Sequence, residues 1–269
     1  MTFLAAIVLG IVQGLTEFLP VSSSAHLILG RAFFGWDAGA LGLAFDVACH
    51  LGTLLSVVLF FRAELVQMAT ALPRALTASD PTARLVRLIV VGTLPIVAAG
   101  LLYTHDVEAA LRTPLVAAVM LVAGGVLMLV AERIGRGVQS EEALGPGGAL
   151  AIGAGQAAAL VPGVSRSGTT ISIGLFLGLR RDAAARFTFL LSIPAILAAA
   201  AKESLELART GLSGDAAALF AVGMIVSGVV GYLTIRFFLR YLAGHRLDVF
   251  AYYRFALAAV TFVWLWARH

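Results

Sequence analysis

Six long apolar runs dominate this sequence and restrict the folds open to it. They cover about residues 44–61, 84–103, 115–131, 184–201, 216–236 and 250–267, and charged or Pro/Gly-rich connections bound each of them. Each run approaches the length of about 20 residues that spans the hydrocarbon core of a bilayer. With 60% hydrophobic and 13% charged residues, the chain carries more apolar surface than one soluble core can bury. The sequence therefore predicts an all-α polytopic membrane protein.

The start of the chain and its cysteine content narrow the class further. Met1 and Thr2 lead directly into the apolar stretch FLAAIVLGIV, without a basic n-region or a small-residue cleavage site, so we expect mature protein and no removable signal peptide. Cys49 is the single cysteine, which excludes an intramolecular disulfide, and no Cys/His cluster has zinc-site spacing. The basic residues lie mostly between the apolar runs, and we expect the lipid bilayer, not nucleic acid, as a partner.

Two further apolar stretches are broken in the middle by helix breakers and polar groups. Residues 1–35 contain LPVSSSAH, and residues 148–178 contain VPGVSRSGTT. Each arm is too short to cross a bilayer, so we expect each stretch to form a re-entrant helix-loop-helix that enters and leaves on one side. Irregular backbone at membrane depth is tolerated only where it lies within protein or lines a wet cavity. The two breaks therefore indicate a functional site.

The two broken stretches share a spacing. From Gln13 and from Gln156, a serine follows after nine residues and another after eleven, and a proline lies just upstream; these positions are Ser22 and Ser165, Ser24 and Ser167, and Pro20 and Pro162. We expect one integral membrane domain, residues 1–269, built from two repeats at about 1–135 and 145–269. Each repeat would hold one hairpin and three spans. Because three is odd, the second repeat would be inverted in the membrane relative to the first.

Positive charge is distributed unevenly over the two sides that this topology defines. One side holds twelve arginines: Arg62, Arg74, Arg84, Arg87, Arg133, Arg136, Arg180, Arg181, Arg186, Arg236, Arg240 and Arg246. The opposite side holds five basic residues: Arg31, Arg112, Lys202, Arg209 and Arg268. Because cytoplasmic loops carry an excess of Lys and Arg, the first side is predicted to be cytoplasmic. The first hairpin would then enter from the extracytoplasmic side and the second from the cytoplasm.

The first break begins with an amide and a carboxylate. Gln13 and Glu17 are four residues apart, so on a helix they share a face. A glutamate in this setting suits a divalent cation. Glu17 can also be read as an interfacial residue, which is the simpler interpretation of one acid near an apolar segment.

The same break continues with three serines and a histidine. Ser22, Ser23 and Ser24 can cap a new helix that carries His26 in its first turn. Serine suits nucleophilic attack and histidine suits proton transfer, although each serine could equally be a simple helix cap. Ser22 and Ser23 precede His26 by four and three residues, so either hydroxyl can face the histidine, whereas Ser24 points elsewhere. Spacing does not choose between Ser22 and Ser23.

The second break, PGVSRSGTT, is a small-residue loop that opens into a helix. Backbone N–H groups at such a start suit a phosphate, together with an arginine and nearby hydroxyls. The candidate phosphate-binding residues of this break are Arg166, Ser165, Ser167, Gly168, Thr169 and Thr170, and Ser22 and Ser24 of the first break are further candidates. A metal, an arginine and a nucleophile together predict phosphoryl transfer. Two polar residues lie in the first predicted span, at 44–61. We expect His50 to be a hydrogen-bonded packing residue. We expect Asp46 to cap the span or to face an outer cavity.

The two motifs QGLTEFLPVSSSAH and PGVSRSGTT, in this order and membrane context, resemble the undecaprenyl-pyrophosphate phosphatase family of the bacitracin-resistance type. The resemblance runs over essentially the whole chain. It implies a plasma-membrane enzyme that removes the terminal phosphate of undecaprenyl pyrophosphate, with a divalent cation such as Mg²⁺ or Ca²⁺, and a homodimer is compatible with it. A secondary transporter or lipid flippase with the same repeats is the alternative. A lipid phosphatase with a histidine nucleophile is a second one, but its motifs are not visible.

The resemblance also assigns roles to residues. It maps the acidic, metal-binding motif onto Gln13 and Glu17 and the phosphate-binding arginine onto Arg166. It maps the serine-histidine motif onto Ser22, Ser23, Ser24 and His26, and it favours Ser23 as the nucleophile, with direct attack by a metal-activated water as the alternative. Gln13 is one of two residue types that the family pattern allows at the first acidic position. This chain therefore has one carboxylate where some relatives have two, which leaves the number of metal ligands open.

Overall fold

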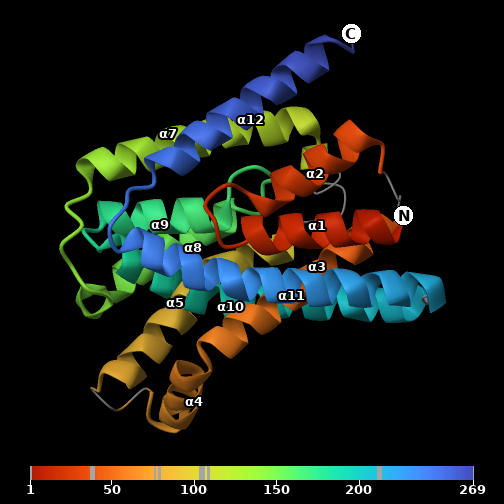
Figure 1. Ribbon diagram of the computed structural model, residues 1–269. Helices are drawn as coiled ribbons and strands as arrows, with labels where there is room; N and C mark the ends of the chain where they lie inside the picture. Colours follow the sequence, from red (N-terminus) through yellow and green to blue (C-terminus); the bar gives the residue numbers. More distant parts are fainter. Residues whose placement is uncertain are drawn as a thin grey trace.

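Helices account for the regular structure of the part of the chain that the computed structural model describes, which is residues 2–36, 40–75, 77, 80–102, 107, 110–210 and 214–268 (Figure 1). The eleven α-helices of this part are α1 (Phe3–Thr16), α2 (Ser23–Phe34), α3 (Ala40–Phe60), α4 (Arg62–Ala71), α5 (Pro81–Leu102), α7 (Pro114–Ile134), α8 (Pro146–Ala158), α9 (Arg166–Phe176), α10 (Arg181–Thr210), α11 (Gly214–Leu242) and α12 (Asp248–Trp266). Two short 3-10 helices, η1 (Leu72–Arg74) and η2 (Glu141–Ala143), and one isolated bridge from Gln139 to Leu179 complete it. The predicted all-α class is confirmed.

Five helices are long and apolar enough to cross a membrane, and they match five of the six predicted spans. These are α5, α7, the part of α10 at Arg181–Ala201, the part of α11 at Ala217–Leu242, and α12. The remaining run forms α3, which continues into α4 after a bend of 78° at Phe61, and the pair counts as a sixth span if it is taken together. The protein is therefore a multi-pass membrane protein. The end of the span predicted at 84–103 lies outside the described residues.

Local signals set several of the helix starts. Thr113 accepts a hydrogen bond from the backbone N–H of Val116, and Pro114 occupies the first turn of α7, where a missing N–H costs nothing. Thr2 caps α1 in the same way. The helix α10 runs past the predicted end at residue 201 because no Pro or Gly interrupts the segment AKESLELART.

The two broken stretches fold into two helix pairs, α1 with α2 and α8 with α9. Their helices have 14, 12, 13 and 11 residues, fewer than the roughly 20 that a span needs. Members of each pair pack against each other. Ser22 and Ser165 are the N-caps of α2 and α9, and both take a left-handed φ, of 73° and 70°. The predicted breaks and capping serines therefore form as expected.

Each of these helix pairs, called a hairpin from here on, packs against a long helix from the other half of the chain. α1 lies against α11, and α8 lies against α5 (Figure 1). Glycines permit both approaches: a Cβ on Gly10 would lie 3.1 Å from the carbonyl oxygen of Gly223, and a Cβ on Gly153 would lie 2.1 Å from that of Gly92. The two glycines occupy matched positions, because Gly10 and Gly153 each lie three residues before a matched glutamine, Gln13 or Gln156.

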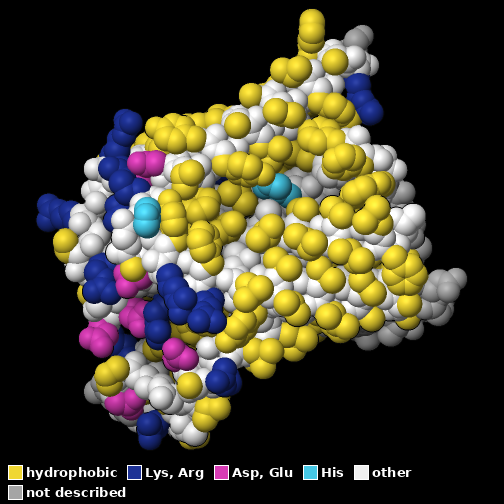
Figure 2. Space-filling model, in the orientation of Figure 1, with side chains coloured by type: hydrophobic (Ala, Val, Ile, Leu, Met, Phe, Trp, Pro, Cys, Tyr) yellow, Lys and Arg dark blue, Asp and Glu magenta, His cyan; other side chains and the backbone are white. Residues whose placement is uncertain are grey.

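Charged side chains gather at one end of the molecule, at the left of Figure 2, while a broad hydrophobic belt covers much of the rest of this face. At this end the buried carboxylate of Glu132 binds groups from three segments of the chain. It accepts hydrogen bonds from Arg181, 2.8 and 2.5 Å long, and from the backbone N–H of Leu247, and it lies 3.4 Å from Arg246. These contacts join the end of α7 to the starts of α10 and α12. Both termini lie toward the other side of the same view (Figure 1).

Candidate active site

We call residues 17–27 the first tip and residues 160–170 the second tip; each lies where the two helices of a hairpin meet. The two tips contact each other through reciprocal hydrogen bonds. The backbone N–H of Gly163, in the second tip, donates to Oγ of Ser24 in the first, over 3.3 Å. Oγ of Ser167, in the second tip, donates to the carbonyl of Leu19 in the first, over 2.9 Å. Ser24 and Ser167 occupy matched positions of the two motifs. The broken segments therefore satisfy some of each other's polar groups.

A buried arginine that the motifs do not include holds the two tips together. Arg254 of α12 has no exposed surface. Its guanidinium donates to the carbonyl of Pro20 in the first tip and to those of Gly163 and Val164 in the second, over 3.3, 2.9 and 3.2 Å. It also donates to two carbonyls of α7, at Met120 and Leu121. Because Gly163 is the matched position of Pro20, one side chain binds equivalent points of both hairpins.

Space for this arginine comes from a glycine on the facing helix. A Cβ added to Gly124 of α7 would lie 2.0 Å from Nη2 of Arg254. An arginine inside an apolar run is itself a signal that sequence reasoning could have used, because such residues usually bind partners inside the protein. Its targets here are backbone carbonyls, which carry no sequence signature.

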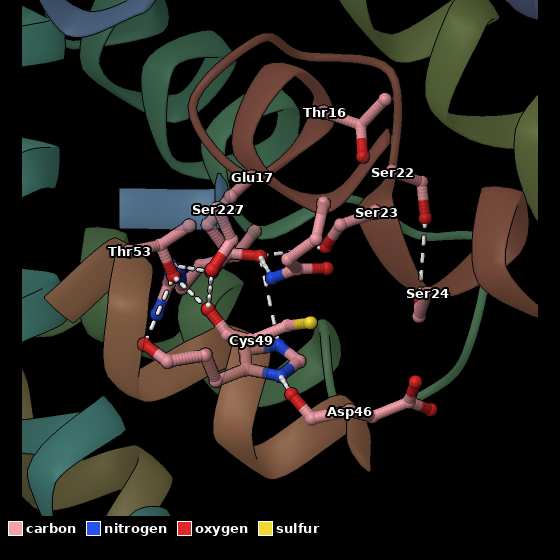
Figure 3. Close-up of polar contacts among 12 residues, drawn as sticks. Thr16, Glu17, Ser22, Ser23, Ser24, Asp46, Cys49, Thr53 and Ser227 are labelled. Atoms are coloured by element: carbon pink, nitrogen blue, oxygen red, sulfur yellow. Dashed lines mark hydrogen bonds and ion pairs between the residues drawn. The ribbon is translucent and has the colours of Figure 1, made fainter. Parts of the chain in front are cut away.

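Glu17 is the centre of the polar contacts between the tips. Its side chain is buried, with 6% of the residue exposed. Oε2 accepts hydrogen bonds of 2.7 Å from the amide of Gln13 and from Oγ of Ser23, and Oε1 pairs with the guanidinium of Arg166. Figure 3 shows Glu17 and Ser23 close together at the turn between α1 and α2. The structure thus brings together four of the residues predicted from the two motifs.

The expected partnership between a serine hydroxyl and His26 takes a different form. Nδ1 of His26 contacts the backbone carbonyl of Ser22 over 2.8 Å, and Nε2 contacts the hydroxyl of Tyr253 over 2.7 Å. The ring also stacks on Tyr253, with centroids 5.6 Å apart. Ser22 is the N-cap with φ of 73°, so ideal helix spacing does not hold at that residue. The hydroxyl of Ser23 donates to Glu17 instead.

A cavity of about 630 Å³ opens beside these groups. Its polar wall includes Glu17, Ser22, Ser23, Ser24, Ser165, Arg166 and Ser167. Its apolar wall comes from Ile96, Val97, Gly100 and Leu101 of α5 and from Ala195, Ile196, Ala198, Ala199 and Ala200 of α10. Leu101 is 83% exposed, so the apolar side reaches the outer surface of the helix bundle. The cavity can therefore accept a molecule with an anionic head and a hydrocarbon body.

His50 and Asp46 of α3 also border this cavity, which agrees with the second of the two alternatives for Asp46. Nε2 of His50 lies 3.6 Å from Oε2 of Glu17, and its Nδ1 contacts the carbonyl of Asp46, so His50 is a residue of the site and does not serve only in packing. Asp46 lies inside α3 and does not cap it; its carboxylate binds Arg31 and Arg112, each over 2.5 Å. The spacing of four residues between Asp46 and His50 was the available signal.

The hydroxyls of the second tip divide into two groups. Ser165 and Ser167 border the cavity, and Ser165 caps α9 by accepting from the N–H of Gly168. Thr169 and Thr170 donate to backbone carbonyls, of Val164 over 3.4 Å and of Arg166 over 2.7 Å. Within the described part of the chain, the residues that border the cavity do not include Gly168 or these threonines. Their assignment to phosphate binding stays a prediction.

Comparison with known proteins agrees with the resemblance noted in the sequence. A family model described as bacitracin resistance protein BacA matches residues 6–260. A protein of Rubrobacter xylanophilus named undecaprenyl-diphosphatase is 52% identical over 261 residues, which are 96% of each chain. Proteins of the same name from Hahella chejuensis and Nitrosococcus oceani are each 44% identical, over 99% and 97% of this chain and 99% and 98% of their own. The chain belongs to the bacitracin resistance protein BacA family.

Proposed function

We propose that this protein is a membrane-embedded phosphatase that hydrolyses undecaprenyl pyrophosphate to undecaprenyl phosphate and inorganic phosphate, and so recycles the lipid carrier of cell-wall synthesis. The curated relatives that match nearly the whole chain carry the name of this activity. The observation that carries the proposal is the convergence of Glu17, Ser23 and Arg166 on one cavity. A carboxylate, a hydroxyl and a guanidinium in contact are the parts that phosphoryl transfer needs.

The shape of the cavity suits the substrate. The diphosphate would lie against the polar wall formed by the two tips, where Arg166 and the serines of both hairpins supply donors. The polyprenyl chain would leave along α5 and α10 past Val97, Leu101 and Ala198, which are exposed apolar residues on the outer surface of the bundle. A lipid substrate can therefore reach the site sideways from the bilayer without its tail crossing a polar surface.

The contacts of Ser23 support a two-step reaction. Oγ of Ser23 attacks the terminal phosphorus while its proton passes to Glu17, which already accepts its hydrogen bond. The bond from phosphorus to the bridging oxygen breaks, and undecaprenyl phosphate leaves. Water then attacks the phosphorus of the phosphoserine and its oxygen stays on the released inorganic phosphate, while Oγ leaves with the proton that Glu17 held, which restores both the hydroxyl and the carboxylate. Arg166 would hold the oxygens of the transferred group throughout. The predicted assistance of His26 in proton transfer stays a prediction, because its ring nitrogens contact the carbonyl of Ser22 and the hydroxyl of Tyr253.

A divalent cation, Mg²⁺ or Ca²⁺, fits the residues at this site. Both ions take oxygen ligands, and Mg²⁺ is commonly held by one or two carboxylates together with substrate phosphates. Glu17 supplies the carboxylate, and Oε1 of Gln13 is a buried oxygen without a hydrogen-bond partner among the described residues. Glu17 and Gln13 would hold the ion, which would neutralise charge on the diphosphate.

We also propose that the chain consists of two inverted repeats in the bacterial inner membrane, each with a re-entrant hairpin. Three observations support this topology. Ser22 and Ser165 cap α2 and α9 with the same unusual φ, and the basic side chains gather at one end of the molecule. Each hairpin also packs against the other half of the chain, α1 against α11 and α8 against α5. Cysteine labelling tests it, since the native Cys49 is buried. A cysteine near Arg112 should react with an impermeant reagent from outside intact cells, and one near Arg136 should not. Labelling of both from one side would contradict the inverted topology.

Phosphate release tests the activity itself. Protein purified in detergent should release inorganic phosphate from undecaprenyl pyrophosphate, and Glu17→Gln, which keeps the size of the side chain, should abolish most of this release. Binding of the lipid without any release would favour the alternative, a transporter or flippase that uses Glu17 and Arg166 for binding alone.

A further inference from the structure

Gln156 of α8 is a buried polar residue for which the motifs and the mechanism above provide no role. It has no exposed surface, and neither Nε2 nor Oε1 of its amide has a hydrogen-bond partner within the part of the chain that the structure describes. It nevertheless borders the cavity, together with Ser165, Arg166 and Ser167 of the second tip. A buried amide that lacks all its partners costs free energy on the order of 1–3 kcal/mol for each group left unsatisfied. Such a group needs an explanation.

Its matched residue in the first repeat shows what the amide lacks. Gln13 donates from Nε2 to Oε2 of Glu17 over 2.7 Å. In the second repeat the position of Glu17 is taken by Leu160, which offers no side-chain acceptor. Gln156 therefore has the matched position of Gln13, but its amide has no hydrogen-bond acceptor among the described residues. The anion that is missing from the chain is one that a ligand in the cavity can supply.

We propose that Gln156 binds the diphosphate head of the substrate, as a substrate-binding residue on the second hairpin. Its amide N–H₂ would donate to a phosphate oxygen that Arg166 also holds, and its amide oxygen would accept from water in the hydration shell of the head group. A turn of the side chain toward the cavity is favourable once the ligand is present, because both atoms then gain partners. This inference rests on the proposed function for the identity of the ligand.

The test separates ligand binding from folding. Gln156→Met removes the amide at similar volume, and Gln156→Leu is a second variant of the same kind. Affinity is measured by calorimetry in detergent with Mg²⁺, using the methylene diphosphonate analogue of farnesyl diphosphate, whose bridging carbon prevents hydrolysis. We expect both variants to bind the analogue about tenfold more weakly or worse. We expect their melting temperature to be unchanged or higher, because an unsatisfied buried amide has been removed.

Ser227→Ala provides the control. Ser227 is fully buried in α11, and its hydroxyl donates to the carbonyls of Cys49 and Met224 over 2.9 and 3.1 Å. It does not belong to the cavity-lining residues of the described chain. Removing this satisfied hydroxyl should lower the melting temperature and leave the affinity for the analogue unchanged, which is the opposite pattern.

The outcomes distinguish this inference from the proposed function. If the Gln156 variants bind the analogue as tightly as wild type, or only lose stability, the inference is overturned even when wild type hydrolyses undecaprenyl pyrophosphate. If wild type binds the analogue, the variants do not, and no phosphate is released from the lipid substrate, the inference stands and the phosphatase activity fails. Absence of analogue binding by wild type overturns the inference.

Discussion

In the first hairpin tip Ser22 takes a φ of 73° and accepts a hydrogen bond from the backbone of Ala25, and in the second Ser165 takes a φ of 70° and accepts one from Gly168. Each serine also lies within hydrogen-bonding distance of the serine two residues later, at 3.2 and 3.4 Å. Left-handed φ is costly for residues other than glycine, and such strain concentrates at functional sites. The two tips therefore share one unusual backbone.

Their chemistry differs at three matched positions. Where the first tip has Glu17, Ser23 and His26, the second has Leu160, Arg166 and Thr169. The first tip thus carries the carboxylate and the proposed nucleophile, and the second carries the guanidinium that pairs with that carboxylate. Two identical tips would place like groups together. Divergence of the side chains on a shared backbone is what brings a carboxylate, a serine hydroxyl and a guanidinium into contact between the tips.

Removing the hydroxyl of Ser23 should have the largest effect on this division of chemistry. Ser23→Ala takes away the nucleophile, and the loss of a nucleophile from a covalent mechanism lowers turnover by about 10³-fold or more. Phosphate release from undecaprenyl pyrophosphate measures this. Rapid quench of wild type on substrate labelled in its terminal phosphate should trap the label on Ser23.

The matched control is a serine of the other tip. Ser165→Ala removes a helix cap worth about 1 kcal/mol and one proposed phosphate donor, so turnover should fall, but far less than in Ser23→Ala. Substantial turnover by Ser23→Ala would remove this residue from the nucleophile's role. Low turnover without trapped label would instead favour direct attack by water.

Replacing the cation of the second tip should have the next largest effect. Arg166→Lys keeps a positive charge, but an ammonium cannot grip two phosphate oxygens in the planar geometry of a guanidinium. We expect turnover to fall by about 10²-fold, with the melting temperature nearly unchanged. Activity close to wild type would show that the guanidinium of Arg166 does not contact the transferred group.

Breaking the link between the tips should affect stability before chemistry. Arg254→Met leaves five backbone carbonyls, from both tips and from α7, without their charged donor. Hydrogen bonds to charged groups contribute roughly 1.5–3 kcal/mol each, and these share one side chain, so we expect a loss of at least about 3 kcal/mol. Thermal unfolding in detergent measures it. Arg268→Met is the control: this arginine is exposed and its guanidinium lies over the ring of Trp264, a contact worth about 0.5–1 kcal/mol at an exposed site, so the loss should be far smaller. Wild-type stability of Arg254→Met would contradict the bridging role.

The sequence predicted the scaffold because its signals are local. Run length gives the spans, and Pro20 and Pro162 with the neighbouring serines give the breaks. The contacts across the chain were beyond such reasoning. His50 was expected to be a packing residue, but its ring lies 3.6 Å from the carboxylate of Glu17. No local pattern in the sequence shows that α3 packs beside the first tip. Spacing also left open whether the hydroxyl of Ser22 or of Ser23 faces His26, and in the structure the ring contacts the carbonyl of Ser22 and the hydroxyl of Tyr253, a residue 227 positions away that spacing does not point to.

The smallest predicted effect compares the two interfaces in which a hairpin meets a span. A Cβ on Gly153 would lie 2.1 Å from a backbone oxygen of Gly92, a distance that only movement of α8 away from α5 could relieve. Overpacking of this kind typically costs about 1–3 kcal/mol, so Gly153→Ala should lower the melting temperature clearly. At Gly10 the nearest atoms would be 3.1 and 3.2 Å away, which shifts of a few tenths of an ångström can accommodate. Alanine there gains up to about 1 kcal/mol of helix propensity, so Gly10→Ala should be close to neutral. Equal melting temperatures for the two variants would show that both hairpins tolerate an added methyl group equally well. The two halves of the chain would then differ at the tips and not in the packing of the helices that carry them.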